Sequence, residues 1–194
     1  MQGLMTRSEL SLLAVNLGVI AFALLGDWSL PTILASYWLQ SVIIGLFQAK
    51  KMSDLKEFRT DRLKINGRAV EPTAATRRKV VLFFLAHYGI FHAAYAGFIL
   101  STGAPYWPDV LLSGAFFFAN HLYSYVVHRH AASKRVPNIA DMMFFPYIRI
   151  VPMQAFIVLG GMTAGSQVGL GFFLFLKTLA DAATHAFEHR GTGT

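Results

Sequence analysis

The chain has 194 residues, of which 55% are hydrophobic and 14% are charged, with a formal net charge of +7 and a mean hydropathy of +0.48. This composition is too apolar for a soluble domain of this length and indicates a membrane protein. The chain contains no cysteine, which excludes disulfides and thiolate metal sites.

Six apolar segments of membrane-spanning length follow one another along the chain. They cover residues 10–26, 30–47, 80–101, 110–127, 142–163 and 168–187. Each is near the ~20 residues that a helix needs to cross ~30 Å of hydrocarbon. Backbone polar groups in lipid must be satisfied within the segment, and no barrel-like alternation is visible, so helices are predicted. The predicted fold is all-α: one integral membrane domain over residues 1–194, with six transmembrane helices in a bundle.

The loop of residues 50–79 between the second and third spans is strongly basic, with ten Lys and Arg residues against four acids. The positive-inside rule places this loop in the cytoplasm, and counting spans outward places both termini there too. We expect the protein to lie in the cytoplasmic (inner) membrane of a prokaryote. The basic loop is interpreted as a topology signal, and an amphipathic helix over residues 52–64 docking on anionic lipid is the alternative. Asn66-Gly67 predicts a tight turn within it.

Ionisable residues of three different spans are predicted to lie at one depth. His87, His121 and Asp181 each fall ~13 Å from the cytoplasmic end of their span, at a rise of ~1.5 Å per residue. Ionisable groups in a membrane are costly and normally face the bundle interior or a wet cavity. We therefore expect these three side chains to lie in the interior of the bundle.

The polar residues of these spans also fall on single helical faces. The third span carries His87, Tyr88, Phe91, His92 and Tyr95 on one side. The fourth carries Asn120, His121, Ser124, Tyr125 and His128, and the sixth carries Lys177, Asp181, Thr184, His185, Glu188 and His189. Because lipid-facing surfaces are apolar, the three faces are predicted to turn toward one another and line a cavity open to the cytoplasm.

Imidazole and carboxylate groups in one cavity suit a divalent metal ion, Zn²⁺ or Fe²⁺, with Mn²⁺ as a further candidate. The predicted ligands are His87, His121, Asp181 and His185, with His128 as an additional candidate. The predicted catalytic residues are Glu188, as proton acceptor near the mouth, and Tyr125. Arg149 and Asn120 are the candidates for binding substrate. The expected activity is that of a membrane metalloenzyme, a hydrolase or an oxidoreductase, acting on an amphiphilic small molecule or lipid.

Other interpretations of the same residues stay open. The string HAFEH at residues 185–189 matches the H-x-x-E-H metalloprotease pattern, but no downstream ligand follows it. Two histidines across helices also suit haem b, in a protein that binds haem or metal without catalysis. A structural membrane subunit would use its histidines only for hydrogen bonds between helices. The expected partners are the lipid bilayer and a second copy of the chain, and no nucleic acid.

The fifth span differs from the others because it contains Pro146, Arg149, Pro152 and Gln154. Proline inside a helix removes a backbone hydrogen bond and crowds the preceding turn. We therefore expect this helix to be kinked or interrupted. Arg149 needs an anionic partner, either a substrate group or one of the acids Asp181 and Glu188.

Five motifs in order carry a resemblance to a known family: YW-x-x-S-x-I-I-G-L-F, AHYGIFHAAY, NHLYSY, PYIRI followed by GG, and LKTLADAATH. They cover most of residues 36–185, and the chain resembles an uncharacterised prokaryotic family of multi-span membrane proteins with a domain of unknown function. The resemblance implies an acid at the position of Gln40 and a histidine near Gln154. Both are amides here, which argues against any role that requires an acid at position 40 or a metal-binding histidine near position 154.

Overall fold

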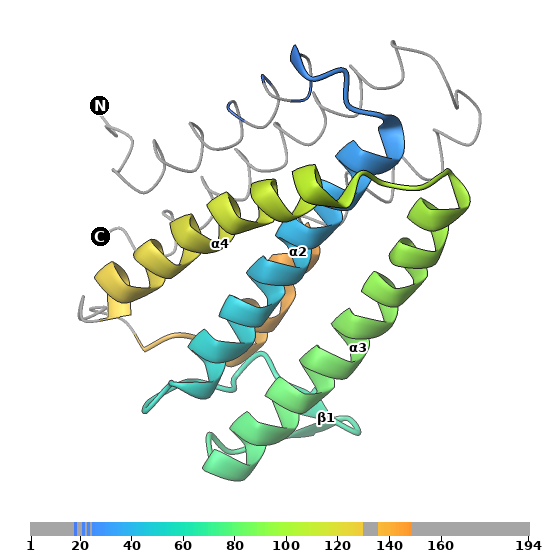
Figure 1. The fold of residues 1–194 in the computed structure, drawn as a ribbon. Coiled ribbons are helices and arrows are strands. Elements are labelled where there is room, and N and C mark those ends of the chain that lie inside the picture. Colours follow the sequence, from blue (N-terminus) through green and yellow to red (C-terminus); the bar gives the residue numbers. More distant parts are fainter. Residues whose placement is uncertain (1–17, 19–20, 22, 24, 130–135, 149–194) are drawn as a thin grey trace, which may run out of the picture. The chain divides into compact units, whose positions relative to one another are not determined.

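The computed structural model describes residues 25–129 and 136–148, together with residues 18, 21 and 23. Within them the chain forms α2 (Leu30–Ser53), β1 (Lys64–Ile65), β2 (Arg68–Ala69), α3 (Ala74–Ser101) and α4 (Trp107–Arg129), shown in Figure 1. A shorter apolar helix follows at Ile139–Ile148. This part of the chain is mostly helical, and the two short strands form one antiparallel hairpin.

Three of these helices, α2, α3 and α4, are long and apolar enough to cross a membrane, as predicted for the second, third and fourth spans. The first and sixth predicted spans and most of the fifth lie outside the described residues, so the count of six spans and the single domain stay predictions. Pro146 lies within the helix Ile139–Ile148, which continues two residues beyond it. Over its described part, the fifth segment is therefore not interrupted at this proline.

Local sequence signals explain where the long helices begin. Pro31 lies in the first turn of α2 and Pro108 in the first turn of α4, where the missing N–H of proline breaks no helical bond. The Thr73 hydroxyl caps α3 by accepting a hydrogen bond of 3.2 Å from the backbone N–H of Thr76. Asp109 in the first turn of α4 carries the charge that the positive end of the helix dipole favours.

The contacts divide the chain into two compact units. Unit 1 comprises residues 1–47 and 90–132, and unit 2 comprises residues 48–89 and 133–194. Helices α2 and α3 each contribute one part to unit 1 and the other part to unit 2.

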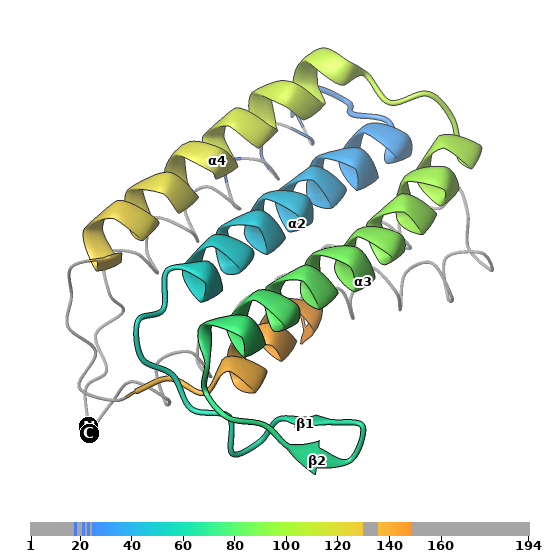
Figure 2. The same ribbon diagram turned by 90° about the horizontal axis from the view of Figure 1, so that it is seen from below.

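In unit 1, α2 packs against both α3 and α4 and lies between them (Figure 2). Its core contains Ile43 of α2 and the completely buried Phe117 of α4, with Trp28, Leu39 and Phe47 packed around them. Gly114 of α4 permits this approach, because a Cβ atom there would lie 2.4 Å from a methyl carbon of Leu39. Small residues at helix contacts serve the same purpose in membrane proteins generally.

In unit 2, the part of the basic loop between the end of α2 at Ser53 and the start of α3 at Ala74 forms the β1–β2 hairpin and no helix. Lys64 pairs with Ala69 and Ile65 with Arg68, and Asn66 and Gly67 adopt the positive φ angles of 52° and 77°. Such angles suit a two-residue hairpin turn, so the predicted turn is confirmed. The alternative amphipathic helix over residues 52–64 is wrong, because α2 ends at Ser53 and the loop's backbone bonds instead to residues 137–139.

Candidate functional site

The buried side of α3 contains only part of the predicted polar face. Tyr88, His92 and Tyr95 are buried, in a row that also includes Phe84. His87 and Phe91 are exposed. The prediction that all five polar and aromatic residues share the interior side is therefore wrong for these two, because one helical step of about 100° rotates His87 away from the row that contains Tyr88.

The predicted polar face of α4 is the less exposed side of that helix. Asn120, His121, Ser124 and Tyr125 are all half-buried, whereas the intervening Leu122, Tyr123, Val126 and Val127 are exposed. The neighbour across the helix contact is Phe47 of α2, whose ring centroid lies 6.0 Å from that of His121 and 5.9 Å from that of Tyr125. Phe47 was not singled out from the sequence, since a phenylalanine in an apolar span carries no distinguishing signal.

Helix α2 carries polar side chains that are buried against neighbouring parts of the chain. Gln40, where the resemblance implies an acid, is 2% exposed, and Gln48 is 8% exposed. The Gln48 side chain donates a hydrogen bond of 2.8 Å to the backbone carbonyl of Met142. Trp38 similarly donates its indole N–H to the carbonyl of His92 at 2.9 Å. Neutral amides at these positions avoid the cost of a buried charge.

His87 has a specific polar partner in unit 2. Its Nδ1 atom lies 2.8 Å from the Tyr147 hydroxyl, within hydrogen-bond distance. The Tyr147 ring also packs edge-on against Phe84 and Tyr88, with centroids 6.1 Å and 5.6 Å away. These contacts hold both the ring and the hydroxyl in place. Tyr147 lies directly after Pro146 in the sequence, and no spacing pattern connects it with His87, sixty residues earlier.

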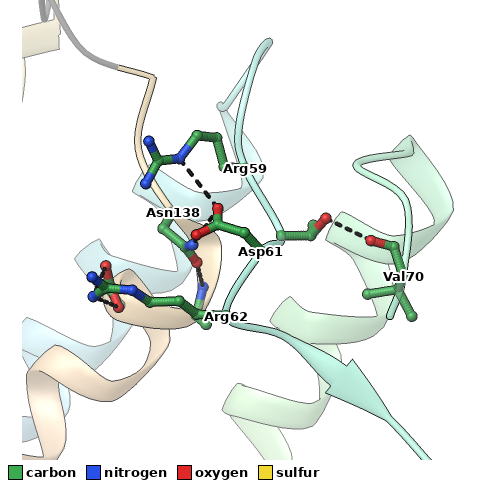
Figure 3. A network of polar contacts seen from close by, with 8 residues as sticks. Arg59, Asp61, Arg62, Val70 and Asn138 are labelled. Atoms are coloured by element: carbon green, nitrogen blue, oxygen red, sulfur yellow. Dashed lines mark hydrogen bonds and ion pairs between the residues drawn. The ribbon is translucent and has the colours of Figure 1, made fainter. Parts of the chain in front are cut away.

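A polar cluster joins the basic loop to the start of the helix Ile139–Ile148 (Figure 3). Asn138 accepts a hydrogen bond of 3.0 Å from the backbone N–H of Ala140, which caps this helix, and its amide donates to Asp61 at 2.9 Å. Arg59 pairs with the same Asp61 at 3.2 Å, and Arg62 reaches both carboxylate oxygens of Asp141 at 3.1 Å.

Backbone hydrogen bonds reinforce the same contact. The N–H of Arg59 donates to the carbonyl of Pro137 at 2.8 Å, and the N–H of Ile139 donates to the carbonyl of Arg59 at 3.1 Å. The side-chain and backbone bonds together fix the loop against the helix that carries Tyr147.

The remaining predicted site residues lie outside the described part of the chain: Arg149, Asp181, His185 and Glu188, together with the side chain of His128. Of the predicted ligands, His87 belongs to unit 2 and His121 to unit 1. Among the residues that the structure describes, no three His, Asp or Glu side chains gather closely enough to hold a metal ion. A metal site of three or more such ligands would therefore need at least one side chain that the structure does not describe.

A family model for a family of unknown function matches residues 2–194, almost the whole chain. The chain belongs to this family, DUF6498. Its membership confirms the predicted resemblance to an uncharacterised family, while the prokaryotic origin stays a prediction. No curated protein and no solved structure matches the chain. Membership in DUF6498 therefore assigns no reaction, and function has to be argued from the residues themselves.

We expect Asn138→Ala to destabilise unit 2 by about 1–2 kcal/mol, because the change removes both a helix cap and a donor to a carboxylate. The measurement is the midpoint of unfolding in detergent. Asn138→Asp is the matched variant: it keeps the capping oxygen but places a second carboxylate beside Asp61. An unchanged midpoint for Asn138→Ala would show that the cluster contributes nothing to stability.

Proposed function

We propose that this protein is an integral membrane metalloprotein, with six transmembrane helices and a divalent metal ion bound by His87, His121, Asp181 and His185. The ion is Zn²⁺ or Fe²⁺, with Mn²⁺ as a further candidate, and His128 is an additional candidate ligand. Tyr125 and Glu188 transfer protons, and Asn120 and Arg149 hold an amphiphilic substrate. The membrane is the cytoplasmic membrane of a prokaryote, with both termini and residues 50–79 in the cytoplasm.

The observation that carries this proposal is the 2.8 Å contact between His87 Nδ1 and the Tyr147 hydroxyl. A histidine that binds a metal ion usually donates its other ring N–H to a second residue, which selects the tautomer and orients the ring. In the tautomer whose Nδ1–H donates this hydrogen bond to the Tyr147 hydroxyl oxygen, Nε2 carries the lone pair that a metal ion requires. The position of His121 on the half-buried face of α4, with the Phe47 ring 6.0 Å from its own, also supports the proposal.

Elemental analysis of the protein, purified without chelator, tests this proposal. We expect about one Zn, Fe or Mn per chain. A Soret absorption band would instead favour the second candidate, a non-enzymatic protein that binds haem b through two histidines. Neither metal nor haem in the purified protein would leave the third candidate, a structural subunit whose histidines form only hydrogen bonds.

The proposed topology is tested by labelling single cysteines introduced into this cysteine-free chain. Glu71 lies in the exposed basic loop, and Tyr106, which is 61% exposed, precedes α4 at the other end of α3. We expect Glu71→Cys to react with an impermeant maleimide only from the cytoplasmic side, and Tyr106→Cys only from the opposite side. Labelling of both from one side contradicts the topology, and the unlabelled wild type serves as the control.

A further inference from the structure

The β1–β2 hairpin is an exposed and well-defined element. All four of its strand residues, Lys64, Ile65, Arg68 and Ala69, are exposed. Its turn has the conformation that a two-residue hairpin requires. Because Ile65 and Arg68 are directly paired, an apolar side chain and a guanidinium group share one face of the hairpin.

The chain on both sides of the hairpin is anchored. The Thr60 hydroxyl donates a hydrogen bond of 2.5 Å to the carbonyl of Val70, which closes the loop at the base of the hairpin (Figure 3). Arg77 bonds to the carbonyl of Leu55. Asp61 is held by Arg59 and Asn138, as described above. The hairpin therefore extends from a fixed base.

Around this base, half or more of the acids are paired with cations, whereas several exposed cations have no acidic partner among the described residues. Three carboxylates pair with cations of the loop: Asp54 with Lys50, Asp61 with Arg59, and Asp141 with Arg62. By contrast, five exposed cations of the loop and the start of α3 make no ion pair with any described residue; these are Lys56, Lys64, Arg68, Arg78 and Lys79. Only Glu57 and Glu71 remain as exposed acids of the loop without such a pair. The accessible charge around the hairpin is therefore predominantly positive.

The ends of two spanning helices place this charge near the membrane surface. The loop begins after α2 ends at Ser53, and α3 begins at Ala74, only five residues after β2. A segment tied this closely to both helix ends lies at the level of the lipid headgroups. Cations beside an exposed isoleucine match that interface, which has anionic groups next to acyl chains.

We infer that the β1–β2 hairpin is a docking site for anionic phospholipids in the adjoining leaflet. Arg68 binds a headgroup phosphate beside Ile65, which contacts the acyl region, and Lys64 binds a headgroup phosphate from the opposite face of the hairpin. Attraction of this kind is worth about a factor of five in affinity for each Lys or Arg near the surface. The inference requires that the protein spans a membrane, but it is independent of the metal site. It also assigns a role to the charge of the basic loop beyond fixing the topology.

The test uses an environment-sensitive fluorophore on Ala69→Cys in the full-length protein, held in non-ionic detergent. Short-chain phosphatidylglycerol is titrated, with phosphatidylcholine and inorganic phosphate as parallel ligands. We expect a blue shift that saturates with phosphatidylglycerol and weakens with added salt. Neither of the parallel ligands should produce it. Equal responses to phosphatidylglycerol and phosphatidylcholine overturn the inference, and a saturating response to inorganic phosphate assigns the cations to free phosphate rather than lipid.

Matched variants locate the binding surface. Lys64→Gln and Arg68→Gln should each raise the apparent Kd for phosphatidylglycerol about fivefold. Lys50→Gln removes the same charge from a cation paired with Asp54 and should leave the Kd within about twofold of wild type, because its carboxylate partner already screens it. If Lys50→Gln weakens binding as much as the hairpin variants, the affinity depends on net charge and the docking site is refuted. Wild-type affinity in both hairpin variants refutes it equally.

Discussion

Phe117→Ala is expected to lower the free energy of unfolding by about 3 kcal/mol, the low end of the range for removing a buried phenylalanine ring. Phe117 is completely buried in a cluster with Ile43, and Trp28, Leu39 and Phe47 pack against this cluster. Within a bilayer, lipid tails are as apolar as the helix surfaces, so no hydrophobic effect drives the helices together. The free energy of unfolding falls because the cavity left by the ring removes van der Waals contacts with its neighbours. The measurement is reversible unfolding of the purified protein in mixed detergent micelles.

The chain provides a matched control for this substitution one residue away. Phe116 is 52% exposed, and Phe118 is 50% exposed. Phe116→Ala removes the same atoms from the same helix but should cost less than about 1 kcal/mol, since lipid or detergent replaces most of its contacts. Equal losses for Phe116→Ala and Phe117→Ala would mean that α4 does not pack on α2 through Phe117.

The second large effect concerns metal content. His121→Ala and Asp181→Asn should each lose most of the bound metal while the protein remains folded in detergent, because each removes one proposed ligand. Lys177→Met should keep the metal, since Lys177 has no place in the proposed site. Full metal occupancy in all three variants contradicts the proposed ligands and favours a hydrogen-bonded network.

Two further variants separate ligation from packing. His92→Ala removes a buried histidine, 5% exposed, that is not a proposed ligand, and this variant should keep the metal. Tyr147→Phe keeps the aromatic contacts but removes the hydroxyl that bonds to His87. Loss of such a supporting hydrogen bond typically lowers metal affinity 10- to 100-fold. An unchanged affinity in Tyr147→Phe would show that this contact does not orient a metal ligand.

Composition and local signals in the sequence were sufficient for several features of this protein. Apolar runs of spanning length predict α2, α3 and α4 because lipid forces backbone hydrogen bonds to form within one segment. Asn66-Gly67 predicts the hairpin turn because few other residues tolerate positive φ at two consecutive positions. The covered side of α4 was also predictable, since its polar residues repeat with helical spacing between uniformly apolar ones.

Only the tertiary structure decided which residues meet. In α3 the aromatic and histidine residues follow one another too densely for periodicity to separate the buried Tyr88 and His92 from the exposed His87. The partners Tyr147 for His87 and Asn138 for Asp61 lie 60 and 77 residues away along the chain. A membrane segment can be apolar on both its lipid-facing and its protein-facing sides, so hydrophobicity alone does not mark the inward face. The packing of the helices selects that face and brings distant polar groups into hydrogen-bond distance.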